Sequence, residues 1–256
     1  MNFGLTNKVC VITGGAKGIG LADAFTLGAE GCKIILIDID KAAGQAAIKE
    51  LKAKDISAFF YLADASNENQ VKEVVKEIEN IFQRCDVLVN NAGIGVKPTY
   101  LLRDMPVSAW DQMINAHLKS TFLWSRAMIP LMEKNHFGRI INMSSMNFTG
   151  GGRAGISHYS AAKAAIAGLT KTLAKEVGGL GITVNAIAPG YVETELIAQF
   201  TPEMREILQK QNPVGRTCLP EEVAALVTFL SSIQAAFING ELICMDGGRR
   251  DFYWGN

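Results

Sequence analysis

The strongest constraint on the fold is a strand pattern, a glycine turn and a helix pattern that follow one another near the N-terminus. Residues 8–13 form an apolar run, which is typical of a strand buried on both faces of a parallel sheet. Gly14, Gly15, Gly18 and Gly20 come next, and an apolar helical pattern begins after them. Glycines let a backbone approach a pyrophosphate, and the N-terminus of a helix supplies free N–H groups. The stretch therefore indicates an α/β fold with a phosphate-binding turn, although a plain tight turn would use the same glycines.

The same alternation of patterns continues along the chain. Further strand patterns lie at residues 33–37, 56–62, 86–89, 139–143, 182–187 and 240–245. Helical patterns separate them at residues 42–54, 68–82, 110–132, 159–177 and 221–231. Strands that alternate with helices predict a parallel sheet covered by helices.

The composition favours one domain and argues against several classes of protein. With 256 residues, of which 48% are hydrophobic, the chain can form one large core, so we expect a single domain over residues 1–256. Lys plus Arg and Asp plus Glu number 25 each, and without a basic surplus no nucleic-acid partner is expected. The five cysteines form no C-x-x-C or Cys/His cluster, so we expect neither a metal site nor disulfides. The chain has no signal-peptide pattern and no run of about 18 apolar residues, so we expect a cytoplasmic protein without membrane association.

The residue that ends the second strand pattern bears on the choice of cofactor. The carboxylate of Asp38 could accept both hydroxyls of an adenosine ribose, and it would repel a 2′-phosphate. This predicts NAD rather than NADP. Lys17, inside the glycine turn, favours the opposite choice because a cation there could meet a 2′-phosphate. We give Asp38 more weight, since Lys17 could be no more than a solvated turn residue.

Other polar residues allow two interpretations each. Asp64 could accept a hydrogen bond from an adenine amino group or could cap the next helix. Residues 90–93 (N-N-A-G) stand where ligands bind in open α/β sheets, but Asn and Gly also favour turns. Asn115 lies inside a helical pattern, where Asn is unfavourable, so it has a hydrogen-bonding role or marks a kink. His117 and His136 have no partner at ligand spacing and are expected to be structural.

Residues 144–163 carry the groups best suited to chemistry. Tyr159 and Lys163 are four residues apart at the start of a helical pattern, so they share one face of the helix. A nearby cation favours the phenolate, which predicts a lowered pKa for Tyr159 and proton exchange near neutral pH. Ser144 or Ser145, at the end of a strand pattern, could bond the same substrate oxygen. Three such groups suit the reversible reduction of a carbonyl, although a Tyr–Lys pair on a helix is often only solvated.

Assembled in order, these motifs resemble those of the classical short-chain dehydrogenases/reductases over nearly all of the chain. The resemblance rests on residues 13–20 (T-G-G-A-K-G-I-G), 90–93, Asn115, Ser145, 159–163 (Y-S-A-A-K) and 189–194 (P-G-Y-V-E-T). It implies an α/β fold, a single Rossmann-like doubly wound domain. Its seven-stranded parallel sheet would have the order 3-2-1-4-5-6-7, with helices on both faces. It also implies a homotetramer built partly from the helices that contain Asn115 and Tyr159.

The resemblance also implies roles for individual residues. Tyr159 would transfer the proton, and Lys163 would lower its pKa and bind the nicotinamide ribose. Ser145 would orient the substrate oxygen, and Asn115 would hold a water behind Lys163. The residues expected to bind the cofactor are Gly14, Lys17, Gly18, Ile19, Gly20, Asp38, Ile39, Asp64, Ala65, Asn91, Ala92, Gly93, Tyr159, Lys163, Pro189, Gly190, Val192 and Thr194.

The substrate is less constrained by the sequence. Ser145 and Tyr159 are 14 residues apart, one more than in many relatives, and we place the extra residue in the glycine-rich span 150–155. Residues 191–215 are expected to form a substrate lid, and the aromatic tail at 249–256 either anchors against a neighbouring subunit or frays. Arg153 could bind an anion, although an arginine there is more often solvated. The residues expected to contact the small-molecule substrate are Met146, Asn147, Arg153, Tyr191 and Leu196.

Three functions are compatible with these features. The leading one is an NAD-dependent oxidoreductase that interconverts a secondary alcohol and a ketone by hydride transfer to or from nicotinamide C4. The alternative is an NADPH-dependent 3-oxoacyl thioester (acyl-carrier-protein) reductase, which Asp38 disfavours. The third is a non-catalytic dinucleotide-binding protein, which the presence of all four candidate catalytic groups disfavours.

Overall fold

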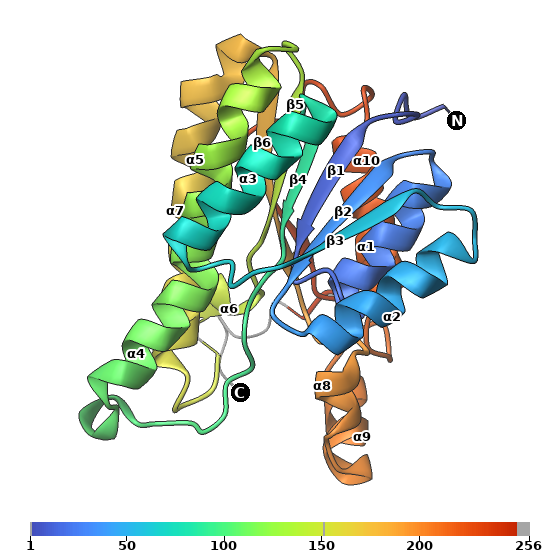
Figure 1. The fold of residues 1–256 in the computed structure, drawn as a ribbon. Coiled ribbons are helices and arrows are strands. Elements are labelled where there is room, and N and C mark those ends of the chain that lie inside the picture. The colour runs from blue at the N-terminus through green and yellow to red at the C-terminus, as the bar shows by residue number, and fades with distance from the viewer. Residues whose placement is uncertain (1, 151, 250–256) are drawn as a thin grey trace.

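A single seven-stranded parallel sheet forms the centre of the molecule in this computed structural model, which describes residues 2–150 and 152–249. Its order is β3-β2-β1-β4-β5-β6-β7, which confirms the order that the family resemblance implies. Figure 1 shows the strands running side by side with their carboxyl ends toward the lower edge. The strands are β1 (Val9–Thr13), β2 (Lys33–Asp38), β3 (Ala58–Leu62), β4 (Val87–Asn90), β5 (Gly138–Met143), β6 (Ile182–Pro189) and β7 (Leu242–Met245).

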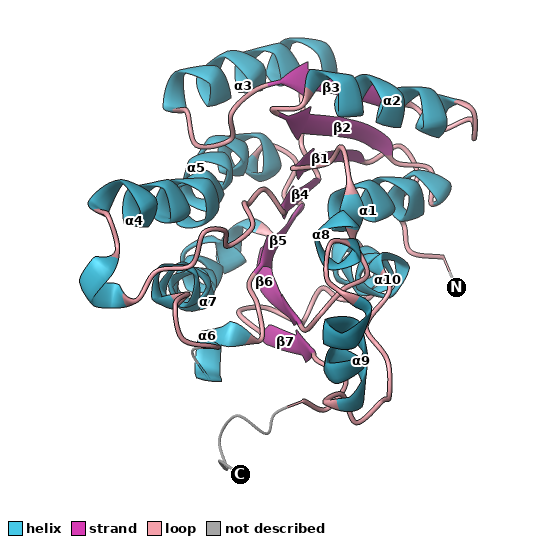
Figure 2. Ribbon diagram, turned by 90° about the horizontal axis from the view of Figure 1, so that it is seen from below, coloured by secondary structure: helices cyan, strands magenta, loops and turns pink. Residues whose placement is uncertain are grey.

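Helices cover both faces of this sheet, and Figure 2 shows the three layers. On one face α1 packs against α10, and α2 lies beside them. On the other face α3, α5 and α7 lie side by side. The helices are α1 (Gly18–Ala29), α2 (Lys41–Lys52), α3 (Glu68–Phe82), α4 (Val107–Ile114), α5 (Ser120–Glu133), α6 (Asn147–Gly150), α7 (Ser157–Val177), α8 (Glu195–Ala198), α9 (Pro202–Lys210) and α10 (Pro220–Ser231), with short 3-10 turns at Leu102–Asp104 (η1) and Gly178–Leu180 (η3).

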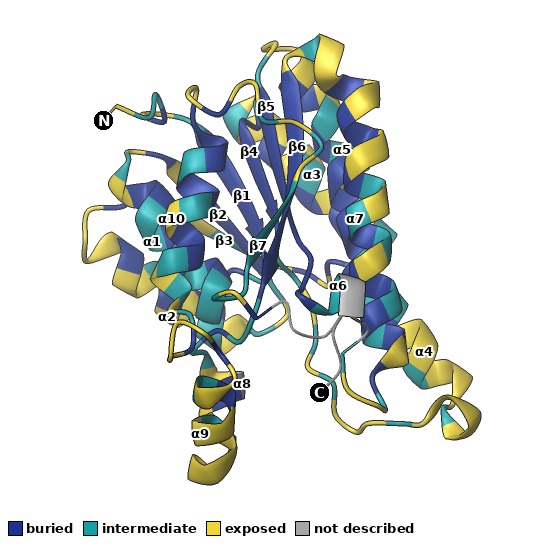
Figure 3. Ribbon diagram, turned by 180° about the vertical axis from the view of Figure 1, so that it is seen from behind, coloured by how far each residue is buried: buried dark blue, intermediate teal, exposed yellow. Residues whose placement is uncertain are grey.

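The sheet separates two hydrophobic clusters, one against each layer of helices. The strands in the middle of the sheet are buried along their whole length, as Figure 3 shows. Alternate strand residues face opposite clusters: Ile34 and Leu36 belong to the cluster under α1 and α10, and Ile35 and Ile37 to the cluster under α3 and α5. Burial on both faces explains the unbroken apolar runs in the sequence.

The register brings separate motifs to one edge of the sheet. In β1, Thr13 stands opposite Ile37 of β2 and Asn90 of β4. The residues that follow these strands therefore emerge at the same level. The glycine turn, Asp38 at the end of β2 and the Asn-rich segment at the end of β4 therefore lie at the carboxyl edge of the sheet, where parallel sheets bind ligands.

The long helical pattern at residues 110–132 is not a uniform α-helix. A π-helical turn, η2 (Asn115–Lys119), lies between α4 and α5. Such turns are rare and often lie at functional sites. Asn115, for which the sequence predicts a hydrogen-bonding role or a kink, is the first residue of this turn.

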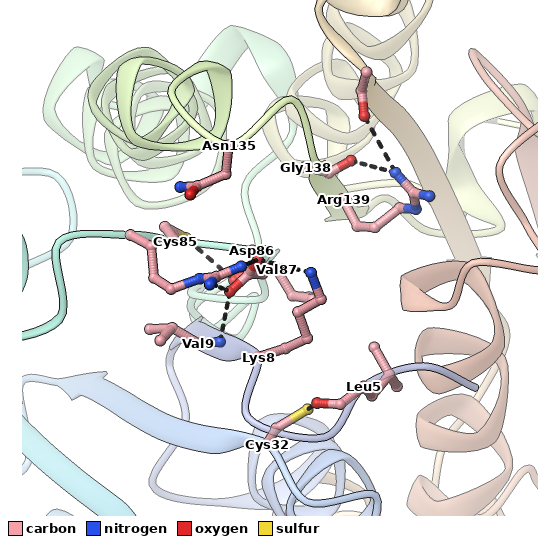
Figure 4. A network of polar contacts seen from close by, with 12 residues as sticks. Leu5, Lys8, Val9, Cys32, Cys85, Asp86, Val87, Asn135, Gly138 and Arg139 are labelled. Carbon is pink, nitrogen blue, oxygen red and sulfur yellow. Dashed lines mark hydrogen bonds and ion pairs between the residues drawn. The ribbon is translucent and has the colours of Figure 1, made fainter. Parts of the chain in front are cut away.

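A buried ionic network lies at the opposite, amino edge of the sheet (Figure 4). The side chain of Asp86 is 0% exposed and accepts hydrogen bonds from Lys8, from Arg84 and from the backbone N–H of Val9. Nearby, the buried guanidinium of Arg139 donates to the carbonyls of Gly138 and Ser232. The charged groups are thus paired or hydrogen-bonded, as buried charges must be.

All five cysteines are free. Over residues 2–150 and 152–249 no cluster of His, Cys, Asp and Glu could hold a metal ion. No described helix has the length and apolar character needed to cross a membrane.

Candidate active site

A cavity of about 740 Å³ opens at the carboxyl edge of the sheet. Its walls come from the segment after β4, the end of β5, α7, the segment after β6, and α8 with α9. The sheet supplies the floor and the two short helices supply one side, so residues far apart in the chain face a common space.

Ser145 and Tyr159 meet at the wall of this cavity. Ser145 is 6% exposed in the segment after β5, and its hydroxyl is close enough to the phenol of Tyr159, at the start of α7, to oppose the rise of that phenol's pKa. The neighbouring Ser144 has another partner, because its hydroxyl donates to the carbonyl of Lys163 over 2.8 Å. Of the two serines, Ser145 is therefore the one placed to bond a substrate oxygen next to Tyr159.

Lys163 lies one turn along α7 from Tyr159, and its ammonium lies over the Tyr159 ring while it is hydrogen-bonded to β5. Its ammonium donates to the carbonyl of Met143 over 2.6 Å and stands 5.8 Å from the centroid of the Tyr159 ring. Burial lowers the pKa of Lys163 to about 7. Burial also raises the pKa of Tyr159, against the opposing effect of the Ser145 hydrogen bond. The expected lowering of the Tyr159 pKa by Lys163 is thus absent, because Lys163 is itself desolvated and turned toward the strand.

The π-helical turn contributes a side chain that the sequence analysis treated as structural. His117 is 3% exposed, lines the cavity, and places its ring edge-to-face on Tyr159 with 5.3 Å between centroids. Its Nε2 is 3.1 Å from the carbonyl oxygen of Ile94, and burial holds the pKa of its ring well below the usual value. Asn115, by contrast, is not among the described residues that line the cavity. The sequence could have indicated a place for His117 in the site, because it lies two residues from Asn115 in the same helical pattern.

The glycine turn is built for close approach of backbones. Gly14 and Gly18 have φ values of +61° and +55°, which side chains disfavour. A Cβ on Gly14 would lie 2.9 Å from the Cα of Ala92, and one on Gly20 would lie 2.4 Å from the carbonyl oxygen of Gly14. The side-chain amide of Asn91 donates to the carbonyls of Thr13 and Gly14. The motifs after β1 and β4 therefore form one cradle at the N-terminus of α1.

Asp38 and Lys17 both have protein partners. The carboxylate of Asp38 accepts from the backbone N–H groups of Ala16 and Asp40. The ammonium of Lys17 pairs with Asp40 over 2.9 Å. Asp38 thus shapes the turn, so an acidic residue at this position is not evidence for a ribose acceptor alone. Ile39 beside it is 69% exposed.

Asp64 belongs to a turn at the end of β3 and does not cap α3. Its carboxylate accepts from the N–H and the hydroxyl of Ser66, while Asn67 caps the helix. Ala65 is 8% exposed. This turn lies next to Asp38, because the N–H of Ala63 donates to the Asp38 carbonyl.

The segment after β6 runs along the cavity. Val192 forms a bridge with Cys218, and Thr194 approaches the glycine turn, since a Cβ on Gly18 would lie 3.3 Å from its Cγ2. The described residues on the cavity wall include these members of the predicted site: Ile19, Asn91, Gly93, Ser145, Met146, Asn147, Arg153, Tyr159, Lys163, Pro189, Gly190, Tyr191, Val192 and Thr194. The Leu196 side chain, the tail at 250–256 and residue 151 of the glycine-rich span lie outside the described residues.

The fold and this constellation define a Rossmann-type oxidoreductase, and comparison with known proteins agrees. A family model described as "Enoyl-(Acyl carrier protein) reductase" matches residues 14–250. The chain belongs to the classical short-chain dehydrogenase/reductase family and is an oxidoreductase of that family.

Individual relatives cover almost the entire chain. It is 39% identical over 244 residues to 3-oxoacyl-[acyl-carrier-protein] reductase FabG of Thermotoga maritima, covering 95% of this chain and 98% of that protein. It is 35% identical over 250 residues to (2S)-[(R)-hydroxy(phenyl)methyl]succinyl-CoA dehydrogenase subunit BbsD of Thauera aromatica, covering 98% and 99%. Among solved structures, a provisionally named gluconate dehydrogenase from Agrobacterium tumefaciens is similar with a TM-score of 0.92 and 28% identity, covering 97% and 98%.

These relatives correct the prediction of NAD as the preferred cofactor. The T. maritima relative carries the name of the reductase that the sequence analysis paired with NADPH. The preference for NAD over NADP was therefore wrong, and a nicotinamide dinucleotide in general is what the comparison supports. The physical reason is the one given above: the Asp38 carboxylate is already bonded by the turn.

Proposed function

We propose that this protein reduces the 3-oxo group of an acyl thioester to a 3-hydroxyl, with a reduced nicotinamide dinucleotide as the hydride donor. The observation that carries the proposal is the Ser145–Tyr159 pair on the wall of the cavity, in a chain whose relative from T. maritima is named a 3-oxoacyl-[acyl-carrier-protein] reductase. This proposal replaces the more general prediction of an enzyme that interconverts a secondary alcohol and a ketone.

The residues present fit a dinucleotide. A side chain at Gly14 or Gly20 would fill the cradle at the N-terminus of α1, where free N–H groups suit a pyrophosphate. The proposal is also supported by the cavity wall, which includes Ile19, Asn91 and Thr194 among the residues expected to bind the cofactor. When bound there, the cofactor would supply a hydride to the substrate carbonyl carbon.

The side chains around the cavity would bind the substrate oxygen and protonate it. Ser145 and Tyr159 donate hydrogen bonds to that oxygen, which stabilises the negative charge that develops on it. The phenolic proton of Tyr159 then passes to the oxygen and completes the hydroxyl. Lys163, when protonated, stabilises the resulting phenolate, and His117 keeps water from the face of the tyrosine ring. Asn115, on the π-helical turn η2, would hold a water behind Lys163.

The remaining parts of the site also serve this proposal. Residues 191–215 would act as the substrate lid of a single domain, because α8 and α9 turn Ile197, Met204 and Leu208 into the cavity. A homotetramer through α4, α5 and α7 would cover Val107 and Phe122, which are 74% and 44% exposed.

The test measures reduction of an acetoacetyl thioester by the purified protein. The reaction is monitored through the loss of absorbance of NADPH and, in a separate assay, of NADH. We expect turnover in wild type and a loss of about 10²–10⁴-fold in Tyr159→Phe, the range for a general acid. Phe keeps the ring that packs on His117, so cofactor binding is expected to survive. Undiminished turnover in Tyr159→Phe would refute the mechanism.

The reverse reaction is the second candidate. The T. aromatica relative is named a dehydrogenase of a hydroxyacyl-CoA thioester. The same groups would then accept the proton of the hydroxyl instead of donating it. Comparing initial rates in both directions at neutral pH separates the two.

A further inference from the structure

The π-helical turn η2 places a buried histidine beside the two groups that carry the proposed proton transfer. The ring of His117 packs edge-to-face on the ring of Tyr159, with 5.3 Å between their centroids. The Lys163 ammonium is also near, because it adds to the effect of burial in lowering the pKa of the His117 ring. The imidazole is therefore neutral at physiological pH and stands next to both Tyr159 and Lys163.

Hydroxyl groups at the start of α5 hold the backbone of this histidine. The buried hydroxyl of Thr121 donates to the His117 carbonyl over 2.8 Å, and the buried hydroxyl of Ser120 is shared between the carbonyls of Ala116 and His117. These bonds hold the part of the turn from which the imidazole projects, so the ring starts from a fixed position.

The far end of the ring is bound to the segment that follows β4. Its Nε2 lies 3.1 Å from the carbonyl oxygen of Ile94 and 3.3 Å from the backbone nitrogen of the same residue. A neutral imidazole donates to the carbonyl in one tautomer and accepts from the N–H in the other, so either tautomer makes this link. The close fit also requires a glycine, because a Cβ on Gly93 would lie 2.3 Å from Cε1 of His117.

This segment belongs both to the cavity wall and to the cradle at the N-terminus of α1. Residues 94–97 line the cavity. Asn91, three residues before Ile94, donates its side-chain amide to the carbonyl of Gly14 in the glycine turn. His117 therefore connects Tyr159 to the segment against which the substrate and the cofactor would lie.

The second nitrogen of the ring makes a histidine unfavourable at this place on grounds of stability alone. Nδ1 of His117 is buried and has no hydrogen-bond partner within residues 2–150 and 152–249. A buried polar atom without a partner lowers the stability of the fold. A phenylalanine would fill much the same space without this penalty, so stability does not explain why the position carries an imidazole.

We propose that His117 is a positioning residue, which holds the phenol of Tyr159 at a fixed place relative to residues 94–97 and so aligns it for proton transfer to the substrate oxygen. It acts through Tyr159 and exchanges no proton with the substrate. The inference rests on the role of Tyr159 in the proposed function, but not on the identity of the acyl group. Proton transfer depends on distance and alignment, and a displacement of about 1 Å costs on the order of 10²-fold in rate.

The first test separates the two contacts of the ring by kinetics with an acetoacetyl thioester. His117→Phe keeps a ring on Tyr159, His117→Gln keeps an amide that can bond Ile94, and His117→Ala removes both contacts. We expect His117→Ala to lower kcat by about 10²-fold with KM values close to those of wild type. The other two variants should lie between it and wild type. A wild-type kcat in His117→Ala, or a change confined to KM, would overturn the proposal.

Stability gives a readout that distinguishes positioning from a structural role. In His117→Phe the unpartnered nitrogen is gone, and water can reach the backbone of Ile94, which is only partly buried. We expect its free energy of unfolding in urea to be at least that of wild type, although its kcat is lower. A fall in stability together with kcat would assign His117 a structural role and would contradict the proposal.

A double-mutant cycle tests whether His117 acts through Tyr159. Once Tyr159→Phe has removed the phenolic proton, the alignment of that ring no longer affects the rate. Adding His117→Ala to Tyr159→Phe should therefore leave the residual kcat unchanged, as for residues that act as a unit. Losses that multiply would show that His117 acts independently of Tyr159. If His117→Ala does not fold, the same cycle is run with His117→Phe.

A matched control and a separate outcome for the proposed function complete the experiment. His136 is exposed on the turn after α5 and is not among the described residues that line the cavity, so His136→Gln keeps the wild-type kcat. Circular dichroism and fluorescence titration with the reduced dinucleotide establish that each variant is folded. Undiminished turnover in Tyr159→Phe refutes the proposed function itself. An inactive Tyr159→Phe beside an unimpaired His117→Ala refutes only the positioning role.

Discussion

Replacing Lys163 with Met should stabilise the cofactor-free protein at acidic pH while it abolishes turnover. The side chain is 5% exposed, and burial lowers its pKa from 10.5 to about 7. That difference corresponds to roughly 5 kcal/mol of unfavourable free energy for holding the ammonium in the folded state. Met has a similar length and needs no solvation, so it removes this penalty.

Part of this gain in stability is offset, because Lys163→Met also removes the hydrogen bond from the ammonium to the Met143 carbonyl. A charged donor to a carbonyl contributes about 1.5–3 kcal/mol, so the net stabilisation of Lys163→Met should be about 2–3 kcal/mol at pH 6. The sign of the pH dependence follows from the lowered pKa. Below pH 7 the lysine is charged in both the folded and the unfolded states, and the whole penalty is present. Between about 7 and 10.5 the unfolded lysine is charged and the folded one neutral, so the penalty shrinks by about 1.4 kcal/mol per pH unit.

The assay is urea denaturation of both proteins between pH 6 and pH 9. The advantage of Lys163→Met should be largest at pH 6 and should diminish steadily above pH 7. Lys171→Met, an exposed position on the same helix, is the control and should change stability by less than about 0.5 kcal/mol. A variant that is less stable than wild type at pH 6, or a difference that does not vary with pH, would refute the argument.

Three further predictions concern other parts of the molecule. Asp86→Asn should lower the free energy of unfolding by about 3 kcal/mol in thermal or urea denaturation, because Lys8 and Arg84 would lose their buried counterion. A loss below 0.5 kcal/mol, within the ordinary range of surface substitutions, would contradict this. Gly20→Ala should abolish dinucleotide binding in a fluorescence titration, since the new Cβ would lie 2.4 Å from a turn carbonyl, whereas Gly168→Ala, with nothing within 4 Å, should leave it intact. Asp40→Asn keeps the side-chain oxygen that caps α2 but frees Lys17, so calorimetry should show tighter NADPH binding with little change for NADH; an equal gain for both would show that Lys17 does not meet a 2′-phosphate.

The alternation of strands and helices and the edge that carries the site could be predicted from the residue patterns, and the strand order from the family resemblance. Runs such as residues 8–13 and 139–143 are apolar because both of their faces are buried, and this is a local property of the sequence. An irregularity near Asn115 could be expected for a similar reason, since Asn is poor in a helix interior, but the π-helical turn itself was not predicted. The contact between the glycine turn and the Asn-rich segment, in contrast, is shown only by the register of the structure.

Interactions between distant segments could not be predicted in this way. The pKa of Tyr159 depends on where the Lys163 ammonium points, and the sequence spacing says only that both lie on one helix face. The sequence indicated Asp38 as a ribose acceptor, because it does not show that the backbone N–H groups of Ala16 and Asp40 donate to the Asp38 carboxylate. His117 was expected to be structural, because nothing in its spacing shows that its ring packs on Tyr159.

The wall of the cavity formed by α8 and α9 has a consequence for how this enzyme can change over evolutionary time. Ile197, Met204 and Leu208 face the cavity, yet none of these described residues belongs to either hydrophobic cluster around the sheet. Substitutions there alter the shape offered to a substrate without opening a void in the core. Selection on substrate choice is therefore largely uncoupled from selection on folding, and new specificities can arise at these positions without compensating changes elsewhere.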